Sequence, residues 1–195
     1  MKNKRNLEFL YEVGTLRFVP RTWRQFLNKD FANVSEHIFR VIWTAIIIAK
    51  EENADMNKVI KMALVHDITE SRNTDVNYLS RMYTKRDEEN AIKDTLKDTS
   101  IEKEFLDLFH EYEQRESLES KIVKDADILE ADIELQEQYA NGVKIKKDFE
   151  VMRKNVRAQL HTKTAKKLWA QIHKSNPHDW HVKGNNRFTK GDWKK

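Results

Sequence analysis

Glycine and proline, the residues that most readily make tight turns, are scarce in this chain. There are four glycines and two prolines among 195 residues. An all-β protein needs many such turns, so their scarcity favours long helices joined by short polar connections. The length suits one domain with a sizeable core. We therefore expect an all-α fold, a single helical bundle.

The composition also excludes several kinds of chemistry. No GxGxxG or GxxxxGK loop is present, so a phosphate would have to be held by a metal ion, Arg or Lys. The absence of cysteine excludes disulfides, thiolate catalysis and zinc–thiolate sites. The N-terminus lacks the apolar core of a secretory signal, and the most apolar run, Val41 to Ala49, is too short to span a bilayer. We expect a cytoplasmic protein with no membrane segment.

Positive charge is concentrated near the C-terminus. From residue 161 onward, nine Lys or Arg stand against two Asp, a net of +7, whereas the whole chain carries +4. Residues 1–160 therefore carry about −3, and the high pI is not a nucleic-acid signature of the core. We divide the chain into a domain over residues 1–173 and a basic tail over 174–195. Trp180 and Trp193 in the tail leave open disorder, docking on the core or contact with a polyanion.

Apolar periodicity predicts most of the helices. Ser35 is the expected N-cap of one of them. Pro20 rules out a helix through the preceding segment, which is predicted to be irregular. The predicted helices span residues 7–13, 35–52, 57–65, 86–97, 101–112, 118–142 and 149–173.

The stretch Lys61 to Glu70 is the most informative in the chain, because an apolar helical run ends there on His66 and Asp67. Each of these side chains is costly to desolvate without a partner. A divalent cation would satisfy both. In the alternative interpretation, the His bonds backbone and the Asp caps the next turn.

Two further positions extend this cluster along the chain. His37 lies in the first turn of a predicted core helix, where it could equally be a structural hydrogen-bonding residue. Asp127 lies beside the apolar stripe of the helix after Leu118, and Asp125 points about 200° away from it. An acid at the edge of a core helix requires a partner, and a cation is one candidate.

A loop before His37 carries arginines beside a tryptophan. Arg17, Arg21 and Arg24 surround Trp23. In such a group the arginines can bind a phosphate and the tryptophan ring can stack on a base or sugar. The alternative is that the Trp packs the loop onto the core while the arginines are solvated.

Taken in order, these residues resemble a known family. His37, His66, Asp67 and Asp127 form the pattern H…HD…D of the HD-domain metal-dependent phosphohydrolases. The local motifs resemble the 5′-deoxynucleotidase branch of that superfamily, the YfbR-like proteins. They are VPRTW at 19–23, VSEH at 34–37, HDITE at 66–70, Thr74-Asp75 and KDADILE at 124–130.

The resemblance implies a role for each residue. His37, His66, Asp67 and Asp127 would hold a divalent cation, and this donor set suits Mn, Co, Fe, Ni, Zn or Mg. Glu70 would be the general acid or base. Arg21 would hold the phosphate, Trp23 would line the nucleotide pocket and Asp75 would accept from the sugar 3′-hydroxyl.

Two departures from the family pattern affect these assignments. The common upstream motif has a Gly between Thr and Trp, whereas Thr22 and Trp23 are adjacent here, so Arg17 and Arg24 compete with Arg21. Asp125 and Asp127 are both candidates for the last ligand. We choose Asp127, because the family pattern K-x-x-D-x-L and the helical face agree.

The resulting expectation is an HD-domain helical bundle that hydrolyses deoxynucleoside 5′-monophosphates to deoxynucleoside and phosphate. An alternative within the superfamily is a dNTP triphosphohydrolase or another nucleotide phosphohydrolase. An alternative from another class is a non-catalytic helical module that binds nucleic acid through its basic tail. Family analogy also implies a homodimer.

Overall fold

The fold is described from a computed structural model, which covers residues 2–27, 31–144 and 146–184. Within those ranges the chain forms helices and no strand, apart from one isolated antiparallel bridge between Pro20 and Asn33. The all-α prediction is confirmed. The helices are α1 Lys2–Gly14, η1 Thr15–Phe18, α2 Arg24–Leu27, α3 Val34–Glu52, α4 Met56–Val65, α5 Glu70–Asn73, η2 Ser80–Met82, α6 Glu88–Leu96, α7 Glu102–Gln114, α8 Leu118–Ala140, α9 Lys146–Gln159, α10 Lys163–Ile172 and α11 Asp179–Val182.

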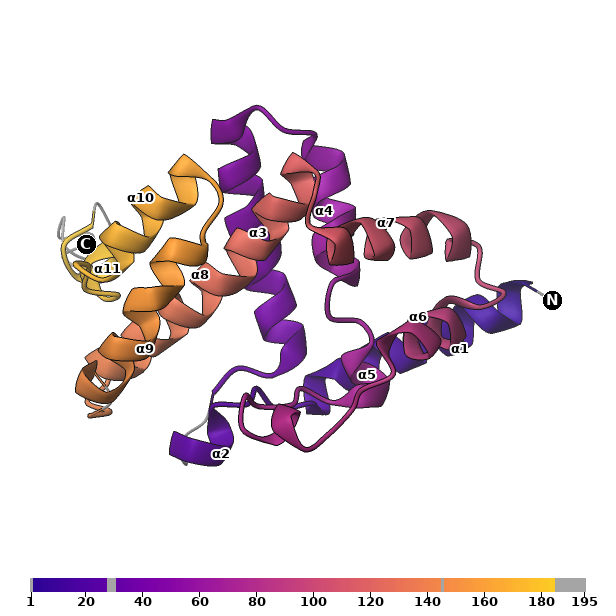
Figure 1. Cartoon of the computed structure of the whole chain (residues 1–195), viewed down its shortest axis with the longest axis horizontal. Helices are drawn as coiled ribbons and strands as arrows, with labels where there is room; N and C mark the ends of the chain where they lie inside the picture. Colours follow the sequence, from indigo (N-terminus) through magenta and orange to yellow (C-terminus); the bar gives the residue numbers. More distant parts are fainter. Residues whose placement is uncertain (1, 28–30, 145, 185–195) are drawn as a thin grey trace, which may run out of the picture.

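Helices α3, α4 and α8 form the centre of the molecule. Figure 1 shows α8 crossing α3, with α9 and α10 on one side and α1, α5 and α6 towards the other. The core residues of these helices are fully buried, among them Val41, Ile48, Met62, Ile122 and Leu129. Burial of each such side chain stabilises the fold by roughly 1.5–3 kcal/mol. The bundle is therefore held by the helices that carry His37, His66 and Asp127.

The start of α3 differs by two residues from the sequence prediction. Asn33, not Ser35, is the N-cap, and it forms a capping box with Glu36. The Asn33 side chain accepts from the Glu36 amide, and the Glu36 carboxylate accepts from the Asn33 amide, both at 3.0 Å. This box fixes the first turn of α3 and therefore the place of His37.

The predicted helix over 149–173 was wrong, because the structure has two helices there. The chain breaks between α9 and α10, where Leu160 is buried and Thr162 caps the second helix. Asp125 accepts hydrogen bonds from the amides of His161 and Thr162, each at 2.8 Å, and from Thr162 Oγ1 at 2.7 Å. A buried carboxylate from another helix thus satisfies amides that a continuous helix would have bonded internally.

None of the described helices is long and apolar enough to cross a membrane. Of the two tail tryptophans, Trp180 lies in α11 and is 79% exposed. Trp193 lies outside the described residues.

Candidate functional site

Four side chains from three separate segments of the sequence meet between α3, the end of α4 and α8. His37, His66, Asp67 and Asp127 each offer one ligand atom, and these atoms all lie within 4.8 Å of one another. His37 Nε2 is 3.3 Å from Asp67 Oδ2 and 3.4 Å from Asp127 Oδ1, and His66 Nε2 is 3.3 Å from Asp67 Oδ2. The structure therefore brings together all four residues of the sequence pattern.

Hydrogen bonds to the Nδ1 atoms of both imidazoles orient their Nε2 atoms towards the two carboxylates of the cluster. His66 is the C-cap of α4, and its Nδ1 bonds the Ala63 carbonyl at 2.8 Å. His37 Nδ1 bonds the carboxyl group of Glu130 at 2.6 Å. Because a carbonyl accepts and cannot donate, Nδ1 of His66 carries a proton. The two Nε2 atoms are buried and have no hydrogen-bond partner among the described residues.

This arrangement fits a divalent cation. Two imidazole nitrogens without partners face two carboxylates, and separations of 3.3–3.4 Å suit neighbouring ligands of one ion with bonds of about 2.0–2.2 Å. The mixed nitrogen and oxygen donor set suits the first-row transition metals and zinc, and magnesium less well. The four side chains thus have the chemistry and the spacing of a metal site.

Electrostatics within the cluster favours the charged forms of its carboxylates. Burial alone would raise the pKa of Asp127, but Lys124, whose Nζ lies 2.7 Å from Asp127 Oδ2, and His37 lower it well below its usual range. Burial also opposes ionisation of Asp67, and His66 and His37 lower its pKa. The carboxylates are therefore available to bind a cation.

Arg21 lies at the edge of this cluster, where it forms an ion pair with Asp75. Its Nη1 donates to Asp75 Oδ2 at 2.9 Å and lies 3.8 Å from Asp67 Oδ2, while the Thr22 amide also donates to Asp75. Burial disfavours the guanidinium charge, but Asp75 and Asp67 raise its pKa above the ordinary value. The Nε of Arg21 is buried without a partner among the described residues.

The other two arginines of this loop lie elsewhere. Arg17 stacks over Phe18 at 4.6 Å, and both Arg17 and Arg24 line a separate cavity. Arg21 lines the same cavity as Asp67 and Asp127. Geometry therefore favours Arg21 over its two neighbours as the arginine that can reach a ligand at the cluster.

Glu70 lies one turn after Asp67 and is almost completely buried. Burial, and after it the negative charges of Asp67 and Asp75, raise its pKa to about 9. Its Oε1 is 3.6 Å from Arg86 Nη1, and its Oε2 has no partner among the described residues. A side chain with this environment can hold a proton next to the cluster.

A cavity of about 470 Å³ opens in front of the cluster. Trp23, Val76, Tyr78, Ile128 and Ala131 give it an apolar part. Its charged lining is balanced, since six basic and six acidic side chains face it. They are Arg21, Arg81, Arg86, Arg115, Lys124 and Arg153, and Asp67, Glu70, Asp75, Glu88, Glu113 and Asp127.

Several residues of the site were not predicted from the sequence. Glu130 supports His37, Lys124 pairs with Asp127, and Tyr112 packs edge-on against His66 at 5.6 Å. Glu130 carries a signal in retrospect, because it lies three residues after Asp127 and so shares its helix face. Tyr112 was assigned to the core from its apolar stripe, and it is indeed buried there.

Comparison with known proteins agrees with this geometry. The sequence profile of the HD domain matches residues 13–173, which is most of the chain. The chain belongs to the HD-domain family. The match includes α3, α4 and α8, the helices that carry all four clustered residues.

Two curated relatives and one solved structure illustrate the similarity. The protein named 5′-deoxynucleotidase HDDC2 in Bos taurus is 34% identical over 137 residues, spanning 67% of this chain and 66% of the relative. Its namesake in Dictyostelium discoideum is 31% identical over 186 residues, spanning 85% and 95%. A conserved hypothetical protein from Pyrococcus furiosus aligns with a TM-score of 0.71 and 24% identity, covering 87% of this chain and 99% of that one. The last shows the shared fold.

Proposed function

We propose that this protein is a metal-dependent 5′-deoxynucleotidase that hydrolyses deoxynucleoside 5′-monophosphates to deoxynucleoside and phosphate. One observation carries the proposal: the four-residue cluster opens onto a cavity that also contains Arg21, Trp23 and Glu70. The relatives named 5′-deoxynucleotidase support the choice of reaction. In this proposal residues 1–173 form the catalytic domain, which agrees with the extent of the family match.

His37, His66, Asp67 and Asp127 would hold the divalent cation. Bound there, the cation would supply Lewis-acid activation of water and neutralise charge on the phosphate. Water attacks phosphorus, the bond to the 5′ oxygen breaks, and one proton must pass from the water side to the leaving oxygen. Glu70, through its unpartnered Oε2, would hold or deliver that proton.

The remaining residues would bind the nucleotide. Arg21 would donate to the phosphate from its free Nε edge, while Asp75 keeps the guanidinium oriented. Trp23 would pack on the base or sugar in the apolar part of the cavity. Asp75 would also accept from the sugar 3′-hydroxyl.

The charge balance of the cavity favours a monophosphate over a triphosphate. A phosphate monoester carries about −1.5 to −2 at neutral pH, which the charge of +2 on one bound divalent cation matches. The additional phosphates of a dNTP would carry further negative charge that a single divalent cation does not match. We therefore rank the triphosphohydrolase second.

A phosphate-release panel tests the proposal. Protein loaded with Mn²⁺ or Co²⁺ is expected to release phosphate from dAMP faster than from AMP, and to leave dATP largely intact. His66→Ala and Asp67→Ala should lose bound metal and hydrolysis together. His110→Ala is the matched control, because His110 lies near the surface beside Glu89 and does not line the cavity.

The proposal fails if no deoxynucleoside monophosphate is hydrolysed and the two variants retain the metal content of the wild type. Removal of residues 174–195 is a separate test of the tail. The nucleotidase proposal expects hydrolysis to survive this truncation nearly unchanged. Loss of nucleic-acid binding without any hydrolysis in the full chain would instead favour the non-catalytic module.

We also propose that two copies associate through α3. Phe39, Trp43 and Ile47 form a stripe along this helix and are 65%, 54% and 52% exposed. Because Phe39 and Ile47 are each four residues from Trp43, an antiparallel two-fold pair would place Phe39 on Ile47 of the partner subunit. Glu36 and Lys50, each seven residues from Trp43, would then meet as opposite charges.

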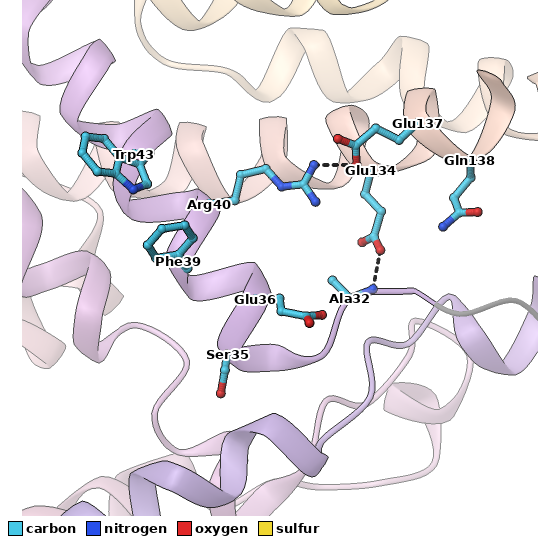
Figure 2. A pocket seen from close by; sticks show the side chains of 9 residues that line it. All are labelled: Ala32, Ser35, Glu36, Phe39, Arg40, Trp43, Glu134, Glu137 and Gln138. Atoms are coloured by element: carbon cyan, nitrogen blue, oxygen red, sulfur yellow. Dashed lines mark hydrogen bonds and ion pairs between the residues drawn. The ribbon is translucent and has the colours of Figure 1, made fainter. Parts of the chain in front are cut away.

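A groove of about 710 Å³ lies beside this stripe, between α3 and α8 (Figure 2). Phe39 and Trp43 line it together with Arg40 and Glu137. If side chains of the partner subunit enter this groove, the dimer interface buries the groove as well as the stripe.

Sedimentation equilibrium tests the dimer. Trp43→Lys should yield monomers at concentrations where the wild type is dimeric, whereas Tyr83→Lys, at a more exposed aromatic residue outside the stripe, should not. A wild type that stays monomeric at high concentration would contradict the proposed association.

A further inference from the structure

Glu130 is the most deeply buried acidic side chain next to the candidate metal cluster, yet it is not one of the four clustered residues. Glu130 and His37 are both fully buried, and Glu130 Oε2 lies 2.6 Å from His37 Nδ1. A carboxylate can only accept, so an ionised Glu130 requires Nδ1 of His37 to be the donor. The remaining ring nitrogen, Nε2, then presents its lone pair to Asp67 and Asp127.

The second imidazole is supported in a different way. His66 Nδ1 donates to the neutral carbonyl of Ala63 at 2.8 Å. Both histidines thus present Nε2 to the cluster, but only His37 has a carboxyl group behind it among the described residues. A carboxylate makes an imidazole a stronger donor to a cation than a carbonyl does.

Glu130 is itself held in place by Arg40, which lines the groove between α3 and α8. Arg40 Nε lies 3.4 Å from Glu130 Oε1, and Arg40 Nη1 bonds Glu137 Oε2 at 2.6 Å, a contact drawn in Figure 2. The buried carboxyl group therefore has a cation on the side away from His37. This arrangement holds Glu130 in one orientation without drawing it off the imidazole.

We propose that Glu130 is a positioning residue for the metal site, holding His37 in the tautomer and orientation that direct Nε2 at the bound cation. The inference rests on the proposed metal site. Glu130 makes no contact with the substrate in this arrangement; it acts through His37. Loss of such a supporting group typically weakens metal binding about 10- to 100-fold.

Glu134 provides a matched control one turn along α8. It is 3% exposed, and its Oε1 accepts from the Ala32 amide at 2.5 Å (Figure 2). Ala32 in turn accepts from the Arg21 amide at 3.2 Å. Glu134 thus supports the loop that carries Arg21, and no contact with His37 is recorded for it in the described chain.

The experiment compares Glu130→Gln with Glu134→Gln in the full chain. Isothermal titration of metal-free protein with Mn²⁺ should show a 10- to 100-fold weaker dissociation constant for Glu130→Gln. Glu134→Gln should stay within about twofold of the wild type and instead raise KM for dAMP. Saturating Mn²⁺ should restore much of the kcat of Glu130→Gln, because its defect lies in holding the ion.

Nitrogen NMR of the zinc-loaded wild type keeps the inference testable if Glu130→Gln does not fold. A proton on His37 Nδ1 with zinc on Nε2 is the expected result. Zinc on Nδ1, or wild-type Mn²⁺ affinity in a folded Glu130→Gln, would overturn the role of Glu130 alone. A wild type that binds no divalent cation would overturn the metal site itself, and this inference with it.

Discussion

Two rows of buried or partly buried acidic side chains run along α8 on opposite sides of the helix. Asp125 and Asp132 face the C-terminal helices, whereas Asp127, Glu130 and Glu134 face α3 and the loop before it. Members of each row recur at intervals of three, four or seven residues, which places them on one side of a helix. We refer to the first set as the far row and to the second as the near row.

The rows differ in how completely their partners satisfy them. Asp125 accepts three hydrogen bonds from His161 and Thr162, and Asp132 accepts two from Arg153. In the near row, Glu130 Oε1 and Glu134 Oε2 have no hydrogen-bond partner among the described residues. The same holds for Nε2 of His37, which faces Asp127.

From this difference in hydrogen bonding we infer that the far row contributes mainly to the stability of the fold and the near row mainly to its function. A buried polar group with full partners stabilises the fold, and one with missing partners reduces stability unless a ligand supplies them. We therefore expect far-row substitutions to lower the free energy of unfolding, and near-row substitutions mainly to weaken metal binding, substrate binding or hydrolysis.

The largest expected effect is that of Asp127→Asn on hydrolysis. Loss of this proposed metal ligand should reduce phosphate release from dAMP by about 10³-fold or more, together with loss of bound Mn²⁺. The metal-free variant should remain folded and lose less stability to urea than Asp125→Ala, because the substitution removes one ion pair with Lys124, in which the pKa of Asp127 is lowered, and keeps the size of the side chain. A variant that is inactive because it is unfolded would contradict the contrast between the rows.

Asp125→Ala should have the opposite profile. Removal of the carboxylate leaves two amides and one hydroxyl at the α9–α10 junction without their acceptor, and we expect a loss of about 3 to 4 kcal/mol in unfolding free energy. Urea denaturation measures this loss. Mn²⁺ affinity of the folded fraction should stay within twofold of the wild type. Asp125→Asn retains one acceptor and should lose about half as much.

Asp125 of the far row also shows why one helix was predicted wrongly when others were predicted correctly. Apolar spacing was sufficient for α3, α4, α6 and α7, whose buried faces are mostly hydrocarbon. It failed at 149–173, because the break there is made by Asp125, a residue from another helix about 36 positions earlier. Apolar spacing within one segment contains no information about such a distant acceptor.

The candidate site also has residues that the sequence pattern predicted and residues that depend on tertiary packing and were not predicted. The four clustered residues followed from the order of motifs, and the structure brings them together. The partners of that cluster were missed, because Glu130 and Lys124 lie among many charged residues of α8, and a position three residues from Asp127 does not by itself show that a charged side chain contacts the cluster. Glu130 is distinguished by its complete burial against α3, and Lys124, which stays partly exposed, by its contact with Asp127 at 2.7 Å.

The smallest expected effect is the pH dependence of the far row at Asp132. Burial alone would raise the pKa of Asp132, but the hydrogen bonds from Arg153 and the nearby imidazole of His173 lower it below its ordinary value. A carboxyl group whose pKa is lower in the folded state stabilises the protein fully above its unfolded pKa, about 3.9, and loses that contribution as the pH falls through the folded value. Asp132→Asn should therefore cost about 2 kcal/mol at pH 7 and progressively less below about pH 4.

Urea unfolding of the wild type and Asp132→Asn at several pH values measures this difference. Asp107→Asn is the control, because Asp107 is exposed and pairs only across one helical turn with Lys103, so its substitution should change stability by less than about 0.5 kcal/mol. A cost at Asp132 that persisted unchanged to pH 3 would mean that packing, and not charge, holds α9 on α8. The far row would then resemble an ordinary core contact, and the contrast with the near row would rest on Asp125 alone.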